Sequence, residues 1–224
     1  MKRGVLLKVD FHCHTHYSRD SIAQIKPLLS AAHRHGLDRL VITDNNCLHG
    51  ALEAHALEPD FVIVGEEIKT TYGEFLAAFV QEAIPAKLDP FKVIELLRVQ
   101  GAFISVSHPF DENRSGWPLD LLKEIAPLVD AFETSNARVL DQRMNDEAQI
   151  FAQNYSLPGT AGSDAHAPYE VGRISLDLPE FNDSETLRRV IREGRVVGKI
   201  SPAWVHGFSM LAKVVKRMRA ESGE

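Results

Sequence analysis

Two histidines separated by one residue, His12 and His14, follow the apolar run Val5-Leu6-Leu7 near the start of the chain. Side chains two positions apart on a strand point to the same side, so both imidazoles should project together from the strand's C-terminal end. Two neutral imidazoles in that arrangement can bind one metal ion. A His-x-His pair also occurs by chance, so the pair alone indicates ligands and not a complete site.

Three later stretches place a carboxylate or an imidazole directly after an apolar or small-residue run. They are Val64-Gly65-Glu66-Glu67, Val106-Ser107-His108-Pro109 and Gly162-Ser163-Asp164-Ala165-His166. Each stretch lies where a strand of a barrel would end. Imidazoles and carboxylates without paired thiolates favour Zn, Mn or Fe in a hydrolytic site over a structural zinc site.

Alternating strands and helices are predicted to position these residues. Strands are expected at residues 5–7 and onward, 40–44, 60–69, 73–80, 103–107, 129–134 and 159–163. Helices are expected at 22–35 with Ser21 as the cap, at 90–100 after Asp89, from 119, and at 141–154. The third and fourth strands are close enough to form a hairpin-like pair. The alternation predicts an α/β parallel sheet or barrel, and the convergence of ligands favours a closed barrel.

Composition bounds the class of protein. At 224 residues, with 44% hydrophobic residues, the chain is long enough for one well-filled core and short for two. No apolar run approaches the length of a membrane span, and we expect a soluble cytoplasmic protein without membrane contact. Two cysteines, Cys13 and Cys47, exclude a disulfide framework. The sequence has no glycine-rich nucleotide fingerprint, so a nucleotide cofactor is not indicated.

The charge of the chain is unevenly distributed. The net charge is −6, yet Arg188 to Arg219 holds nine Lys or Arg and one acidic residue. Apolar residues recur at helical spacing toward the end of that segment, which predicts a basic amphipathic helix at about 207–220. Such a helix can close the barrel's outer wall or contact a polyanion, and we favour the structural role.

Five ordered motifs resemble those of the PHP (polymerase and histidinol phosphatase) family. They are Asp10-x-His12-x-His14-Thr15-x-x-Ser18-x-Asp20, Ile42-Thr43-Asp44, Gly65-x-Glu67, Ser107-His108-Pro109 and Gly162-Ser163-Asp164-Ala165-His166. The resemblance extends from about Val5 to about Gly172. It implies a distorted seven-stranded (β/α)7 TIM-like barrel of the PHP type. It also implies a single PHP domain over residues 1–224, of the small stand-alone metal-dependent phosphoesterase type.

The resemblance implies two or three divalent metal ions and a set of ligands for them. His12, His14, Glu67 and Asp164 would surround the deepest ion. Glu67 would bridge to a second ion that His108 also binds, and Asp20 with His166 would hold a third. Asp164 and His166 are also expected to take part in catalysis. We choose Glu67 over Glu66 because Glu66 would face the opposite side of its strand.

Two positions depart from the family pattern. Asn45 stands where family members commonly have a histidine, and an amide oxygen is a weaker ligand than imidazole for these metals. The third site is therefore expected to be weak or empty. Glu74 stands where many family members have a second histidine, but a carboxylate can still bind the second ion.

Hydrolysis of a phosphate ester is the expected reaction. Two metal ions can acidify a water molecule and neutralise the phosphoryl oxygens. The phosphate also needs cationic donors, and arginine offers a planar fork. Arg138 is the first choice because it follows a strand at the barrel mouth, with Arg19, Arg114 and Arg173 as other candidates.

Several alternatives stay open at this point. The substrate is expected to be a phosphorylated small molecule or a short nucleic acid, and the oligomeric state is unknown. A catalytically weakened domain that acts as a binding or regulatory module is one rival. A metal-dependent amidohydrolase is another, although the matching motifs have no lysine at a strand end for carbamylation.

Overall fold

The computed structural model of the chain describes residues 6–114, 116–202, 204 and 205. The helix expected at about 207–220, and with it the role of the basic segment's end, lies outside the described residues. Within the described part, no helix is long and apolar enough to cross a membrane.

Nine strands form one sheet in the order β7-β6-β5-β4-β3-β2-β1-β8-β9. The strands are β1 Leu6–Asp10, β2 Arg39–Ile42, β3 Val62–Lys69, β4 Glu74–Ala78, β5 Phe103–Val106, β6 Ala131–Asn136, β7 Gly159–Gly162, β8 Ile174–Pro179 and β9 Arg195–Gly198. The expected α/β class is confirmed. The expected count of seven is wrong for the described residues, because β8 and β9 extend the sheet beyond β1.

The strand directions are mixed. β1, β2 and β3 are parallel to one another, and so are β5, β6 and β7. β4 runs antiparallel to both β3 and β5, as the hairpin-like prediction requires. β8 and β9 are also antiparallel to their neighbours. The parallel strands therefore share one C-terminal edge, while β4 reverses within it.

The sheet curls into a nearly closed barrel, because the chain after β1 meets the end of β7. The amide of Phe11 donates to the carbonyl of Ala161 at 3.1 Å, and Cys13 forms a parallel bridge with Ala165. β1 itself pairs with β8 over Leu6 to Val9. The early residues of β1 therefore pair with β8, and the segment that follows β1 pairs with the end of β7.

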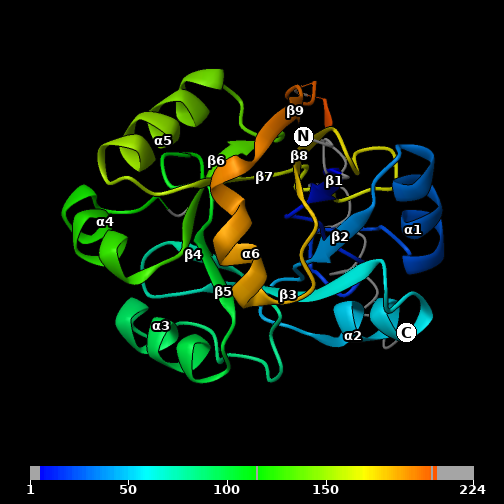
Figure 1. Cartoon of the computed structure of the whole chain (residues 1–224), viewed down its shortest axis with the longest axis horizontal. Coiled ribbons are helices and arrows are strands. Elements are labelled where there is room, and N and C mark those ends of the chain that lie inside the picture. Colours follow the sequence, from blue (N-terminus) through cyan, green and yellow to red (C-terminus); the bar gives the residue numbers. More distant parts are fainter. Residues whose placement is uncertain (1–5, 115, 203, 206–224) are drawn as a thin grey trace, which may run out of the picture.

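Six α-helices lie around this sheet in the described part of the chain. They are α1 Ile25–Arg34, α2 His49–Leu57, α3 Pro90–Val99, α4 Leu119–Ile125, α5 Gln142–Asn154 and α6 Ser184–Val190. In Figure 1, α1 and α2 cover one flank of the barrel and α3, α4 and α5 cover the opposite flank. α6 crosses the barrel between them.

The helix starts follow local capping chemistry. α3 begins as expected, because the Asp89 side chain accepts from the amide of Phe91 and proline occupies the first turn. The expected start of the first helix at residue 22 is wrong, since α1 begins at Ile25 after Gln24. The Ser21 hydroxyl donates instead to the carbonyls of His14 and His166. Ser21 therefore joins two loops of the site and does not cap α1.

Three clusters of buried apolar side chains hold these layers together. Two lie between the sheet and the outer helices, and the third fills the barrel. Phe11, Phe103 and Ala131 contribute to that interior, and α6 adds Leu187. Arg188 of α6 donates to the carbonyl of Ala102, just before β5 begins. α6 thus covers the N-terminal ends of the parallel strands, opposite the end where the predicted ligands lie.

Candidate metal centre

The C-terminal ends of the strands bring most of the predicted ligands into one buried cluster. These residues are His12 and His14 after β1, Glu67 in β3, Glu74 at the start of β4, His108 after β5, and Asp164 and His166 after β7. His12 and Asp164 are fully buried. The cluster therefore draws on residues from opposite ends of the sequence.

Three overlapping groups in the described chain could each hold one metal ion. They are, first, His12, His14 and Glu67; second, Glu67, Glu74 and His108; and third, His14, Asp164 and His166. Within each group the possible ligand atoms lie within 4.8 Å of one another. Glu67 belongs to two groups, as does His14, so neighbouring ions could share ligands.

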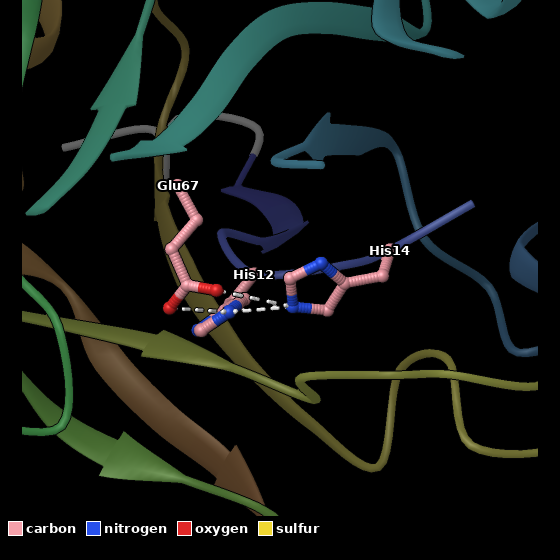
Figure 2. A group of neighbouring side chains, drawn as sticks. All are labelled: His12, His14 and Glu67. Carbon is pink, nitrogen blue, oxygen red and sulfur yellow. Dashed lines mark hydrogen bonds and ion pairs between the residues drawn. The ribbon is translucent and has the colours of Figure 1, made fainter. Parts of the chain in front are cut away.

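The first group has the tightest geometry. His12 Nε2 lies 3.0 Å from His14 Nε2 and 3.4 Å from Glu67 Oε1. Figure 2 shows the two imidazoles pointing toward each other and toward the Glu67 carboxylate. Asp164 Oδ1 approaches from β7, at 3.2 Å from His14 Nε2 and 3.6 Å from His12 Nε2. Two imidazole nitrogens and two carboxylates therefore converge on one point.

The hydrogen bond behind His12 determines which ring nitrogen carries its proton. His12 Nδ1 lies 2.9 Å from Glu133 Oε1. A carboxylate accepts hydrogen bonds, so Nδ1 must be the donor. In the neutral ring, Nε2 then presents its lone pair to the cluster.

The same reasoning applies to His14 through Ser18. The Ser18 hydroxyl donates to Asp44 Oδ1 at 2.6 Å and accepts from the amide of Asn45 at 3.1 Å. Its single proton is thereby used, so His14 Nδ1, at 3.1 Å, must donate to Ser18 Oγ. His14 Nε2 then also presents a lone pair.

These contacts leave acceptor atoms facing one another, which requires a cation between them. Among the described residues, Asp164 Oδ1 is buried and has no hydrogen-bond partner. Burial opposes protonation of His12, yet nearby carboxylates, that of Asp164 foremost, hold its pKa well above the usual range. Either a proton or a metal ion satisfies this arrangement. The donor set of imidazole and carboxylate fits Zn, Mn or Fe.

The second group lies between β3, β4 and β5. His108 Nε2 is 3.2 Å from Glu67 Oε1 and 3.5 Å from Glu74 Oε2. Burial and the neighbouring Glu67 raise the pKa of Glu74. Glu66 faces the other way and accepts from the amide of Ile84. The structure therefore brings Glu67 and Glu74 into the cluster and leaves Glu66 outside it.

The third group lies at the edge of the cluster. His166 Nδ1 donates to the carbonyl of Asp164 at 2.8 Å, so its Nε2 lone pair faces Asp20 Oδ1 at 3.3 Å. Burial and the adjacent His14 lower the pKa of His166 to about 4. Asn45 Nδ2 of the side-chain amide lies 3.5 Å from the same Asp20 oxygen. Asn45 is thus present at this edge, as the sequence motif predicts, with an amide where an imidazole would be.

Two family models match this chain. The model of the PHP domain matches residues 10–114, and the model described as PHP-associated matches residues 142–196. MJ0417, an uncharacterized protein of Methanocaldococcus jannaschii, is 35% identical over 184 residues, which cover 79% of this chain and 72% of that protein. The chain belongs to the PHP family.

Solved structures of other proteins share the PHP fold of this chain. PsfC from Pseudomonas syringae superposes with a TM-score of 0.68 at 16% identity and covers 95% of this chain and 98% of its own. A proposed metal-dependent phosphoesterase from Bifidobacterium adolescentis has a TM-score of 0.63 at 16% identity, and the match covers 84% of this chain and 96% of that protein. The lesion-specific endonuclease PfuEndoQ from Pyrococcus furiosus has a TM-score of 0.60 at 18% identity, and the match covers 86% of this chain and 58% of that protein. At these identities the likeness concerns the fold.

Two arginines differ in how they approach the PHP cluster. Arg138, the first choice for a phosphate donor, is 3% exposed and donates to Glu170 at 3.1 Å. Arg114 forms an ion pair with Asp164 Oδ2 and lies 3.2 Å from Asp111, and its side chain is 24% exposed. Arg114 therefore reaches the cluster from the solvent side, while Arg138 is held in a buried pair.

Sequence reasoning missed the polar residues that surround the ligands. Glu133 and Asn136 of β6 contact His12 and Asp164 respectively, and Ser18 and Asp44 support His14. For Glu133 the sequence offers one indication of a buried role, because this charged residue directly follows the apolar residues Ala131 and Phe132 within a short strand. Ser18 and Asp44 lie inside the motifs Asp10-x-His12-x-His14-Thr15-x-x-Ser18-x-Asp20 and Ile42-Thr43-Asp44, which do not by themselves indicate that these two residues support His14.

Proposed function

We propose that this PHP chain is a metal-dependent phosphoesterase. Its ligands would be His12, His14, Asp20, Glu67, Glu74, His108, Asp164 and His166. The observation that carries the proposal is the pair of Nε2 atoms 3.0 Å apart whose protons are assigned to the opposite ring nitrogens. Such a site is built for a cation.

The position of Glu67 supports a site with more than one metal ion, because its carboxylate could be shared by two ions. Its Oε1 lies within 3.4 Å of Nε2 of both His12 and His108, which belong to different groups. Ser107 donates to the same oxygen at 2.9 Å and fixes the carboxylate. Divalent ions, when bound, would neutralise phosphoryl oxygens and acidify a water molecule for attack on phosphorus.

Arg114 is the residue that we propose for phosphate recognition, in preference to Arg138. Phosphoryl transfer develops charge on the phosphoryl oxygens, and a guanidinium can bind two of them at once. Burial opposes its charge, but Asp164 and Asp111 raise the pKa of Arg114, so it stays cationic. Arg138 would then act from behind, through Glu170, on the loop that carries His166.

The substrate is proposed to be a phosphate ester, either a small phosphomonoester or a short nucleic acid. Proteins of the same fold are described as a phosphoesterase and as a lesion-specific endonuclease, which supports the ester class. Neither likeness selects between the two sizes of substrate. The ions are proposed to be two or three of Zn, Mn or Fe.

Metal analysis combined with a hydrolysis assay tests this proposal. Protein expressed with added Mn, Fe or Zn should retain stoichiometric metal and hydrolyse p-nitrophenyl phosphate or bis(p-nitrophenyl) phosphate. His12→Ala should lose metal and at least about 100-fold of the activity, since even supporting residues of metal sites contribute 10–100-fold. His33→Ala is the matched control, because His33 pairs with Glu58 on the surface.

The outcomes separate the rival functions. Protein that holds no metal would contradict the proposal. Protein that holds metal but cleaves neither ester would support the binding-module alternative. Cleavage of an amide substrate in place of both esters would support an amidohydrolase.

A further inference from the structure

Glu133 is a fully buried carboxylate that contacts the candidate metal centre from behind. It lies within β6 and accepts three hydrogen bonds. Its Oε1 accepts from His12 Nδ1 at 2.9 Å, and its Oε2 accepts from the amide of His108 at 2.8 Å and from Asn136 Nδ2 at 3.1 Å. The donors come from the chain after β1, the chain after β5 and the end of β6.

We propose that Glu133 is a positioning residue that fixes the ring tautomer of His12 and holds the His108 backbone, so that two of the candidate metal groups keep a common geometry. This inference rests on the metal site proposed above. It assigns Glu133 no contact with substrate or with the reacting atoms.

The first step of the argument is the chemistry of the acceptor. A carboxylate has acceptor sites on both oxygens and no donor, so one residue can serve all three N–H groups. His12 can then keep its proton on Nδ1, and its Nε2 stays available to the cluster. A primary amide cannot serve this set, because one of its two ends must donate.

The second step concerns His108. Its φ angle is +23°, a backbone conformation that residues other than glycine rarely adopt. The amide of the same residue is the donor to Glu133 Oε2. Glu133 therefore holds a strained backbone in place at the point where the His108 side chain turns toward Glu67.

The third step links Glu133 to the β7 side of the cluster. Asn136 Nδ2 donates both to Glu133 Oε2 and to Asp164 Oδ2, at 3.1 and 3.2 Å. Asp164 Oδ1 is then left to face the histidines. One buried acceptor thus contacts, directly or through one amide, residues of all three candidate groups.

The isosteric variant Glu133→Gln gives a sharp test. If the amide oxygen faces His108 and Asn136, the amide NH2 faces His12 Nδ1 and forces the proton onto Nε2. If the amide is reversed, its NH2 meets two other donors. Either orientation weakens the site, and metal affinity should fall about 10- to 100-fold, the usual effect of removing a supporting contact to a metal-binding histidine.

Two readouts distinguish positioning from a merely structural role. Zinc affinity is measured by competition with a chromogenic chelator. The protonated ring nitrogen of His12 is identified by NMR of protein labelled with ¹⁵N-histidine. Wild type should show the proton on Nδ1 of His12, both with zinc and without metal at a pH where the ring is neutral. The variant should lose that Nδ1 proton signal where the amide NH2 faces His12, and where the amide is reversed it should keep the signal but bind zinc more weakly.

Glu66→Gln is the matched control, since Glu66 is a buried glutamate of β3 that faces away from the cluster. It should leave both readouts unchanged. A Glu133→Gln protein with wild-type zinc affinity and the proton still on Nδ1 overturns the inference. If the variant does not fold, a wild-type protein whose neutral His12 carries its proton on Nε2 overturns it equally. Wild type without any metal affinity contradicts the proposed function instead, and the tautomer measurement still decides the role of Glu133.

Discussion

At the scale of single residues, the candidate metal centre is a set of acceptor atoms for which protons and metal ions compete. In the metal-free protein, burial opposes protonation of His12 and His14, but the surrounding carboxylates outweigh it and raise the pKa of both. The same contacts hold the pKa of Glu67 well below its usual range, against the effect of burial. Imidazolium and carboxylate therefore coexist in the metal-free cluster.

Proton competition predicts the pH dependence of metal binding. Because the pKa of His12 is raised, its ring keeps a proton at pH values where a free imidazole has lost it, and it must lose this proton before Nε2 can bind metal. Apparent affinity should therefore rise with pH, by about tenfold per unit for each proton displaced. Chelator competition between pH 6 and pH 8 measures this slope. His33→Ala should keep the slope, and an affinity independent of pH would contradict competition between a proton and the metal at His12.

The candidate ligands other than Glu74 could be proposed from the sequence because each lies in a short motif. The supporting contacts could not, because they join residues far apart: His12 and Glu133 are separated by 121 positions. Arg114 was one of four arginine candidates, and its ion pair with Asp164 depends on how two distant loops meet. Partners of this kind are determined by the closed sheet and not by local pattern.

At the scale of elements, the closing seam between the extension of β1 and β7 determines where His12 stands. Gly162 ends β7 directly against this extension. A Cβ atom at Gly162 would lie 2.4 Å from His12 Cβ and 2.7 Å from the His12 backbone nitrogen. Backbone cannot yield as a flexible side chain can, so any larger residue must separate the two strands.

Gly162→Ala should therefore weaken both stability and metal binding. We expect a loss of about 1–3 kcal/mol in the free energy of unfolding, typical of overpacking at a tight contact. Metal affinity should fall as well, because His12 and Asp164 flank the seam. Denaturant unfolding and chelator competition measure the two effects. Gly116→Ala is the control, since a Cβ there would come no closer than 3.9 Å to its nearest neighbours.

Most elements with a clear apolar pattern were predicted, although β8 was missed despite its buried Ile174, Leu176 and Leu178. Strands β1 to β7 and helices α3 and α5 follow buried runs or capping residues in the sequence. α2 was missed because its buried face consists of small residues, Gly50, Ala51 and Ala54. β9 was missed because all four of its residues are exposed and show no alternation. α1 begins later than predicted because Ser21 is used by the site.

At the scale of the whole molecule, the two ends of the barrel have different tasks. The candidate ligands lie at the C-terminal ends of the parallel strands, where barrel enzymes carry their chemistry. α6 lies at the opposite end, where Leu187 is fully buried in the barrel interior. Arg188 joins α6 to Asp130 and to the carbonyl of Ala102. Changes at the two ends should therefore have separable effects.

The pair of variants Leu187→Ala and His108→Ala tests this separation. Leu187→Ala removes buried methyl groups and should cost about 2–5 kcal/mol of unfolding free energy. The Leu187→Ala protein that stays folded should bind as much metal as wild type, because no candidate ligand contacts α6 among the described residues.

His108→Ala should lower metal stoichiometry, since the second group loses its imidazole. In the metal-free state, His108→Ala should lose less stability than Leu187→Ala does. Thermal unfolding of metal-free protein and metal analysis of folded protein supply both readouts. If Leu187→Ala lowered metal stoichiometry as much as His108→Ala, the barrel interior would have to couple its two ends, and α6 would belong to the functional site.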